Sequence, residues 1–136
     1  MHNLPAHDMK FGVLIARDCA EYVDANMQLL LDELANLGCT TERIVLREVP
    51  TTHDLLLGTE FFAEYTDVDG VIILAPNNRI MGNLALMNGI VTIQIQWNMA
   101  VAIGGAECAA NIVEMICIQN EMESEAVMVK PRRNIN

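Results

Sequence analysis

Short apolar runs alternate with longer amphipathic segments, and this alternation constrains the fold more than any other feature of the chain. The runs are residues 10–16 (KFGVLIA), 43–49 (RIVLREV), 71–75 (VIILA) and 91–95 (VTIQI). Runs that are apolar on both faces are typical of strands in a parallel sheet covered by helices on both sides. Alternating strands and helices predict right-handed βαβ units in a doubly wound sheet.

The segment after the first run has helical periodicity. Its apolar residues recur at intervals of four, three, four and three residues, namely Val23, Met27, Leu30, Leu34 and Leu37. This spacing is one buried helical stripe. We expect the helix to begin at Asp18, which forms a capping-box pattern with Glu21, and to end at Gly38 as a C-cap.

Two more helices are expected. Thr51 or Thr52 can cap a helix that runs to about Tyr65. Its inner side would carry Leu55, Leu56, Phe62 and Tyr65. The last helix is expected over residues 98–120, and it is apolar almost all round, which favours burial against a neighbouring subunit as well as the sheet. The charged tail, residues 121–136, is expected to be loose at its end.

The chain of 136 residues is the size of one domain, with residues 1–9 as an N-terminal arm. Its formal net charge is −10, so it repels phosphate backbones and anionic membrane surfaces. We therefore expect no nucleic acid partner and no membrane partner. An anionic small substrate stays compatible with this charge because local fields in a site can oppose the net charge.

The stretch 80–106 is uncharged but is interrupted by amides and glycines, which favours buried elements over a membrane-spanning helix. Residues 1–9 lack the apolar region of a signal peptide. The four cysteines, Cys19, Cys39, Cys108 and Cys117, form no CxxC pair. They are interpreted as reduced, small apolar residues, and we expect a cytoplasmic protein with no metal and no cofactor.

In doubly wound sheets, ligands bind beyond the carboxyl ends of the strands. Here those ends are residues 17–18, 50–54, 76–83 and 96–98. Any functional site is expected at these positions.

These strand ends carry a family resemblance. The segments that resemble lumazine synthases, in the family's order, are KFGVLIARDC (10–19), VPTTHD (49–54), DGVIILA (69–75) followed by Arg79, and GAECAA (105–110) leading to Glu114 and Met115. The family's counterparts are an apolar run with Ala-Arg-Phe-Asn, a Val-Pro-Gly-Ala-aromatic-Glu turn, an Asp-Ala-Val-Ile-Ala-Leu-Gly strand with a following Arg, and a Gly-Ala-Glu-Ala-Ala…Glu-Met helix. Together the matches cover most of residues 10–118. Archaeal-type riboflavin synthases share this scaffold and are a weaker match.

The resemblance implies a flavodoxin-like, three-layer α/β/α sandwich with a short parallel four-stranded sheet in the order 2-1-3-4. It also implies homopentamers, which can assemble into a shell, with sites between adjacent subunits. The family's reaction in riboflavin biosynthesis condenses 5-amino-6-ribitylaminouracil with dihydroxybutanone phosphate.

The chain departs from the family at several site positions. Asp18 replaces the aromatic residue that stacks on the pyrimidine ring, and Thr51-Thr52 replaces the Gly-Ala turn. The acid becomes the shorter Asp54. The phosphate-binding loop retains only Gly82, and the family's histidine falls near Leu84. The family's late Arg and Lys have no clear counterpart. Losing stacking and phosphate binding together predicts weak catalysis.

Two residues are candidates for catalysis. His53 could act as an acid/base at a strand-to-helix junction, or it could be an ordinary polar residue in the first turn of a helix. Arg79 could pair with a phosphate, or form a surface or interface ion pair.

Other residues are candidates for ligand binding. They are Asp18, Thr51, Thr52, Asp54, Pro76, Asn77, Gly82, Asn83, Trp97 and Glu107. Asp18 is explained equally by N-capping, and Asp54 by the helix dipole. Trp97, expected at the end of the fourth strand, could be the ring platform or a packing residue. Glu107 should have a polar partner or face a subunit boundary.

Three functional hypotheses follow. The first is a lumazine synthase homologue, a transferase with reduced or lost activity. The second is a catalytically silent relative that forms an assembly or binds a flavin-like or lumazine-like ligand. The third is a structural protein that uses only the oligomeric scaffold and binds no pterin, lumazine or flavin.

Overall fold

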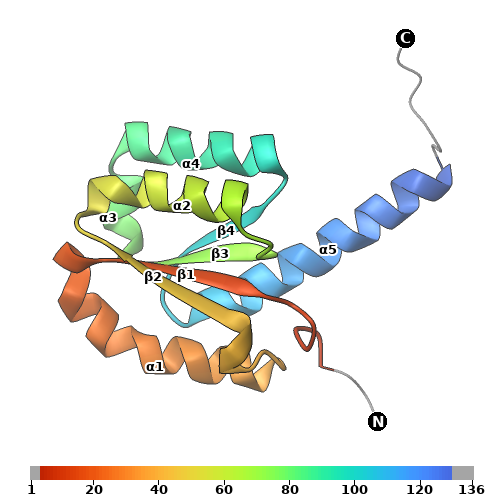
Figure 1. Ribbon diagram of the computed structural model, residues 1–136, viewed down its shortest axis with the longest axis horizontal. Helices are drawn as coiled ribbons and strands as arrows, with labels where there is room; N and C mark the ends of the chain where they lie inside the picture. The colour runs from red at the N-terminus through yellow and green to blue at the C-terminus, as the bar shows by residue number, and fades with distance from the viewer. Residues whose placement is uncertain (1–3, 130–136) are drawn as a thin grey trace.

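A four-stranded parallel sheet forms the central layer, with strand order β2-β1-β3-β4 (Figure 1). Its strands are β1 (Phe11–Ala16), β2 (Ile44–Val49), β3 (Gly70–Leu74) and β4 (Ala100–Gly104). The computed structural model describes residues 4–129. The order and the parallel pairing confirm the predicted fold.

Helices cover both faces of the sheet. α1 (Ala20–Asn36) and α5 (Glu107–Val129) pack together on one face. α2 (Leu55–Tyr65) and α4 (Leu84–Trp97) pack together on the other, next to the short α3 (Asn77–Met81) (Figure 1). The second half of α5 projects beyond the sheet (Figure 1).

The central strands carry the core. Val13 of β1 pairs with Leu46 of β2 on one side and with Ile72 of β3 on the other. All five residues of β3 are buried, as expected for a strand covered on both faces. β2 is an edge strand, and Leu46 on it is 47% exposed.

α1 has the predicted stripe. Val23, Leu30 and Leu34 are buried, and Met27 and Leu37 pack against the core. Gly38 follows the helix with φ +105°, a left-handed conformation that favours glycine. Its backbone N–H donates to the carbonyl of Ala35 at 3.0 Å, which confirms the predicted C-cap.

The predicted start of α1 is wrong. A 3₁₀ turn, Arg17–Cys19, precedes α1, and Cys19 occupies the N-cap without a side-chain capping bond. The Asp18 carboxylate does not form a capping box with Glu21. It reaches across the sheet edge to Thr52 instead.

The second helix has the predicted start and end, but one residue of its predicted inner side is exposed. Thr51 and Asp54 form a capping box at the 3₁₀ turn Thr52–Asp54, which leads into α2. Leu55 and Phe62 are fully buried. Tyr65, which was expected on the inner side, is 69% exposed because it lies in the last turn of the helix.

The predicted fourth strand is also wrong. Residues 91–95 lie inside α4, and the fourth strand is β4, which the sequence reading placed within the last helix. Asn83 caps α4 by accepting a hydrogen bond from the backbone N–H of Leu86 at 3.1 Å. Asn98 ends α4 in a left-handed conformation, so the chain can turn into β4. The last helix therefore begins at Glu107 and runs on to Val129.

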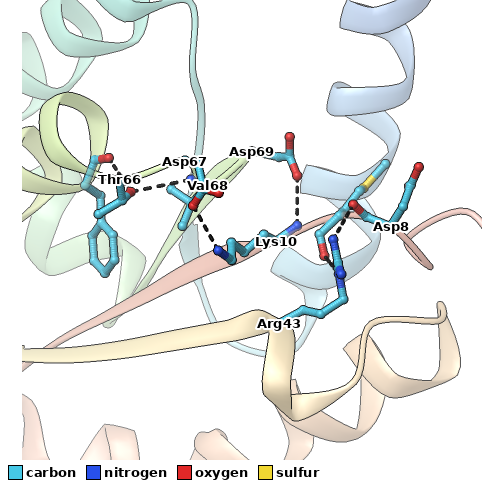
Figure 2. A network of polar contacts seen from close by, with 9 residues as sticks. Asp8, Lys10, Arg43, Thr66, Asp67, Val68 and Asp69 are labelled. Carbon is cyan, nitrogen blue, oxygen red and sulfur yellow. Dashed lines mark hydrogen bonds and ion pairs between the residues drawn. The ribbon is translucent and has the colours of Figure 1, made fainter.

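A network of polar contacts fixes the strands at the amino end of the sheet (Figure 2). The backbone N–H of Lys10 donates to Asp69 at 2.8 Å, and its ammonium lies 2.9 Å from a carboxylate oxygen of Asp67. Arg43 donates from Nε to the carbonyl of Met9 at 2.9 Å. These contacts join the residues just before β1, β2 and β3.

Among the helices that the structure describes, none is long and apolar enough to cross a bilayer. The extreme ends of the predicted arm and tail, residues 1–3 and 130–136, lie outside the described residues.

Candidate functional site

The carboxyl ends of the strands lead into four connections. They are the 3₁₀ turn after β1, the turn 50–54 after β2, residues 75–76 before α3, and residues 105–106 before α5. In a parallel sheet these connections share one edge, where ligands bind. The sequence predicted the first three, and the misplaced β4 hid the fourth.

Asp18 joins the end of β1 to the turn after β2. Its carboxylate accepts hydrogen bonds from the backbone N–H of Thr52 at 3.0 Å and from the Thr52 hydroxyl at 2.9 Å. The hydrogen bond from the Thr52 backbone is the main cause that holds the pKa of Asp18 below its usual range. Asp18 is therefore ionised at neutral pH.

Arg79 links the connection after β3 to Asp18 in the turn after β1. Its Nη1 donates to the backbone carbonyl of Asp18 at 3.2 Å and to Cys19 Sγ at 3.4 Å. A cavity of about 390 Å³ opens here, and its lining includes Arg17, Asp18, Cys19, Tyr22, Pro76 and Arg79. The structure thus brings three of the candidate residues, Asp18, Pro76 and Arg79, to one cavity. A guanidinium in this position can bind an anionic group.

His53 is exposed and faces a different hollow. It lines a shallow groove of about 490 Å³ between α2 and α4, together with Leu56, Gly89, Thr92 and Gln96 among others. His53 and Arg79 therefore do not line the same cavity within one chain.

Thr51 and Asp54 are hydrogen-bonded to each other. One oxygen of Asp54 accepts from the backbone N–H of Thr51 at 3.0 Å and from its hydroxyl at 2.9 Å. This capping box leaves the second carboxylate oxygen, Oδ1, as the atom that could meet a ligand.

Glu107 has the polar partner that the sequence required. Its Oε2 accepts from the backbone N–H of Gly105 at 3.0 Å, at the start of α5. Burial and then the charge of Glu107 raise the pKa of Tyr22. A Cβ on Gly105 would lie 3.0 Å from the Tyr22 hydroxyl and 3.1 Å from Asn26 Oδ1, so both side chains would have to shift slightly to admit a larger residue.

Sequence reasoning missed Tyr22 and Asn26. Both lie on α1 beside the turn that follows β4. Their spacing places both residues on one face of α1. The sequence could have linked that face to the site only if β4 had been predicted in its correct place.

Trp97 lies at the opposite edge of the sheet. It is in the last turn of α4, just before β4 begins, and lines a cavity of about 250 Å³ with Asp69 and Glu123 among others. The prediction that Trp97 ends the fourth strand is wrong, because that segment is helical.

The remaining candidates lie around α3. Pro76 is the N-cap of α3, Asn77 is its first residue and Gly82 follows its end. Asn83 uses its side chain to cap α4, so that oxygen is already engaged.

Cysteine chemistry and metal binding receive little support. Among residues 4–129, no group of three or more His, Cys, Asp or Glu residues is placed to hold a metal ion. The four cysteines are free thiols in the structure. Burial raises the pKa of Cys39, and that of Cys108 to about 12. Both are therefore poor nucleophiles at neutral pH.

Comparison with known proteins gives one informative match. No known family profile matches the chain. A 6,7-dimethyl-8-ribityllumazine synthase from Polynucleobacter necessarius subsp. necessarius (strain STIR1) is 28% identical, over an alignment that covers 83% of this chain and 80% of that protein. This chain is similar to a lumazine synthase. The similarity agrees with the sheet order and with the motifs at the strand ends, and it supports a lumazine synthase-like protein at low identity.

Proposed function

We propose that this protein is a cytoplasmic, lumazine synthase-like transferase of riboflavin biosynthesis. In this proposal it condenses 5-amino-6-ribitylaminouracil with dihydroxybutanone phosphate at the carboxyl edge of the sheet, at a reduced rate. The observation that carries the proposal is Arg79, whose guanidinium lines the cavity between the ends of β1 and β3. There it would bind the anionic phosphate of the four-carbon substrate.

The proposed roles follow from the contacts. Arg79 is restrained through Nη1, so it meets an anion with little loss of side-chain freedom. His53 would transfer the proton, a contribution of about 100- to 10,000-fold to the rate. Because the chain has Leu84 where the family has its histidine, His53 would replace that histidine only in part.

We propose that a neighbouring subunit completes the site. His53 and Arg79 line separate hollows within one chain, so they can meet only across a subunit boundary. Exposed apolar side chains support self-association. They form an α2 face of Leu57, Phe61 and Tyr65, and an α4 face made by Val91 and Ile95 of α4 with Met115 of α5. The proposed assembly is a homopentamer.

The test is to mix the purified protein with both substrates and to follow lumazine absorbance above the spontaneous background. We expect a rate above background but below that of an authentic synthase. Arg79→Ala should raise KM for the phosphate substrate, and His53→Ala should lower kcat by about 10- to 100-fold, less than a fully placed acid/base would.

Matched controls separate these effects from general damage. Arg47 is an exposed arginine on β2 that donates only to the carbonyl of Leu46 among the described contacts, so Arg47→Ala should keep the wild-type rate. His7→Ala serves the same purpose for His53, because His7 lies in the N-terminal arm. A wild-type rate equal to the background would refute the proposed activity.

A second function is favoured by a specific observation. The Asp18 carboxylate, hydrogen-bonded to Thr52, lies where the family places a stacking aromatic ring. This favours a catalytically silent relative that forms an assembly or binds a flavin-like or lumazine-like ligand. Binding of riboflavin or lumazine without turnover, measured by fluorescence quenching, would support it.

A further inference from the structure

Asp18 contacts two of the other connections at the site edge, and the proposed chemistry does not use its side chain. Its carboxylate accepts two hydrogen bonds from Thr52 in the turn after β2. Its backbone carbonyl accepts from Arg79 Nη1 on α3. The 3₁₀ turns that carry Asp18 and Thr52 also pack against each other. One residue therefore links the ends of β1, β2 and β3.

We propose that Asp18 is a positioning residue that fixes the His53 turn against the end of β1, so that His53 stands where Arg79 of a neighbouring subunit can complete the site. This inference rests on the proposed function of those two residues, and it adds a role that goes beyond capping or ligand contact.

The turn that carries His53 is held on both sides. Thr52, its immediate neighbour, is bound to the Asp18 carboxylate through both its N–H and its hydroxyl. Asp54, the neighbour on the other side, is bound to Thr51 in the capping box. The capping box is internal to the turn, so it fixes the shape of the turn. The Asp18 carboxylate is the contact that fixes its place against β1.

Arg79 is held by a different atom of the same residue. The contact uses the backbone carbonyl of Asp18 together with Cys19 Sγ, at 3.2 and 3.4 Å from Nη1. A substitution of the Asp18 side chain therefore releases the His53 turn and leaves the hydrogen bond of Arg79 to the backbone in place. Because the substitution removes one contact and keeps the other, it distinguishes a positioning role from a general loss of structure.

The charge of Asp18 suits this role. Hydrogen bonds from Thr52, and more weakly the nearby Arg79 charge, keep the pKa of Asp18 below its usual range. An ionised carboxylate accepts stronger hydrogen bonds than a neutral acceptor. The groups that face the carboxylate are Thr52, the Cys19 thiol and the Arg79 guanidinium.

The experiment compares Asp18→Ala, Asp18→Asn and Thr52→Val with the wild type. Asp24→Ala is the matched control, since Asp24 is an exposed carboxylate on α1. The first readout is nuclear magnetic resonance of the His53 ring and of the Arg79 Nε–H, assigned with His53→Asn and Arg79→Lys. The second readout is kcat and KM for the condensation.

In Asp18→Ala we expect the His53 ring signals to shift while the Arg79 signal stays. Asp18→Asn should restore most of the wild-type spectrum, because its amide can still accept from the Thr52 N–H. Thr52→Val, which removes only the hydroxyl, should give a smaller shift of the His53 signals. If Asp18→Ala does not fold, Thr52→Val tests the positioning role in its place. kcat should fall by about 10- to 100-fold in Asp18→Ala with little change in the KM of the phosphate substrate.

Unchanged His53 signals in Asp18→Ala and Thr52→Val would overturn the inference. A raised KM with unchanged signals would overturn it too, because it would make Asp18 a ligand contact. A background rate in the wild type would refute the proposed function alone, since the resonance readout needs no turnover.

Discussion

Asn98 shows how a single residue permits a change of direction in the chain. It is the non-glycine residue with a positive φ in the described part of the chain, with φ 51° and ψ 49°. Its side chain donates to Glu123 at 2.9 Å, and its carbonyl accepts from Gln119 at 2.6 Å. α5 thus holds the left-handed turn that connects α4 to β4.

We expect Asn98→Val to destabilise the protein by about 2 kcal/mol. The left-handed conformation costs residues with a Cβ about 1–2 kcal/mol, asparagine least among them, and the hydrogen bond to Glu123 is also lost. Asn98→Gly should stay within about 1 kcal/mol of the wild type, because glycine adopts this φ freely. Urea unfolding at a fixed protein concentration measures both. Equal stability of the two variants would show that the left-handed conformation does not cause the loss of stability in Asn98→Val.

The same scale shows where sequence reasoning about single residues reached its limit. Asp18 stands at the right place for an N-cap, and a sequence pattern gives no sign of a partner 34 residues away. The cap of the second helix is local, and the sequence narrowed it to Thr51 or Thr52, of which the structure has Thr51. Local hydrogen bonds can be inferred from spacing, whereas contacts across the sheet edge depend on the register of β1 and β2.

At the scale of elements, β1, β2, β3, α1 and α2 could be predicted, and β4 and α4 could not. Residues 91–95 alternate and are rich in β-branched side chains, so they look like a strand, yet they form the second half of a helix. β4 is a short run of small apolar residues that can equally be read as helix. Two asparagines were the sequence signals for these elements: Asn83 caps the start of α4, and Asn98 ends α4 and turns the chain into β4.

The packing of α2 against α4 gives a test at this scale. A Cβ on Gly89 of α4 would lie 2.6 Å from a methyl carbon of Leu56 on α2. Alanine favours a helix by about 1 kcal/mol over glycine, and we expect Gly89→Ala to lose most of this gain because the end of the Leu56 side chain must move. In a background of Leu56→Ala, the same change should become stabilising, because the clash is gone. A double-mutant cycle from urea unfolding measures this coupling. Additive effects would contradict the predicted close packing.

At the scale of the whole molecule, the two apolar faces lie on different flanks. On α4, Gly89 and Thr92 face α2, whereas Val91 and Ile95 line a hollow with Met115 of α5. The α2 face is a separate surface, on which the rings of Phe61 and Tyr65 lie 5.6 Å apart. Two different faces favour a head-to-tail contact, and such contacts generate rings when the rotation closes.

We expect Ile95→Asp and Phe61→Asp each to abolish assembly beyond small species, since a buried charge at either face is costly. An equimolar mixture of the two variants should form a dimer, because each retains one intact face. Analytical ultracentrifugation of each variant and of the mixture checks this. A mixture that stays monomeric would argue against contact between the α2 face and the α4 face. Lys10→Ala, which changes the amino end of the sheet, is a control for general destabilisation.

If the proposed ring forms, two unlike faces on one subunit also govern how its assembly fails. In a head-to-tail ring every subunit is used twice, once through each face, and no subunit occupies an end. A subunit with one face disabled can join a growing ring, but it has no second face to which the next subunit can bind. A minority of such subunits would therefore act as chain stoppers, so that a defect confined to one side chain controls the size of complexes built mostly from intact copies.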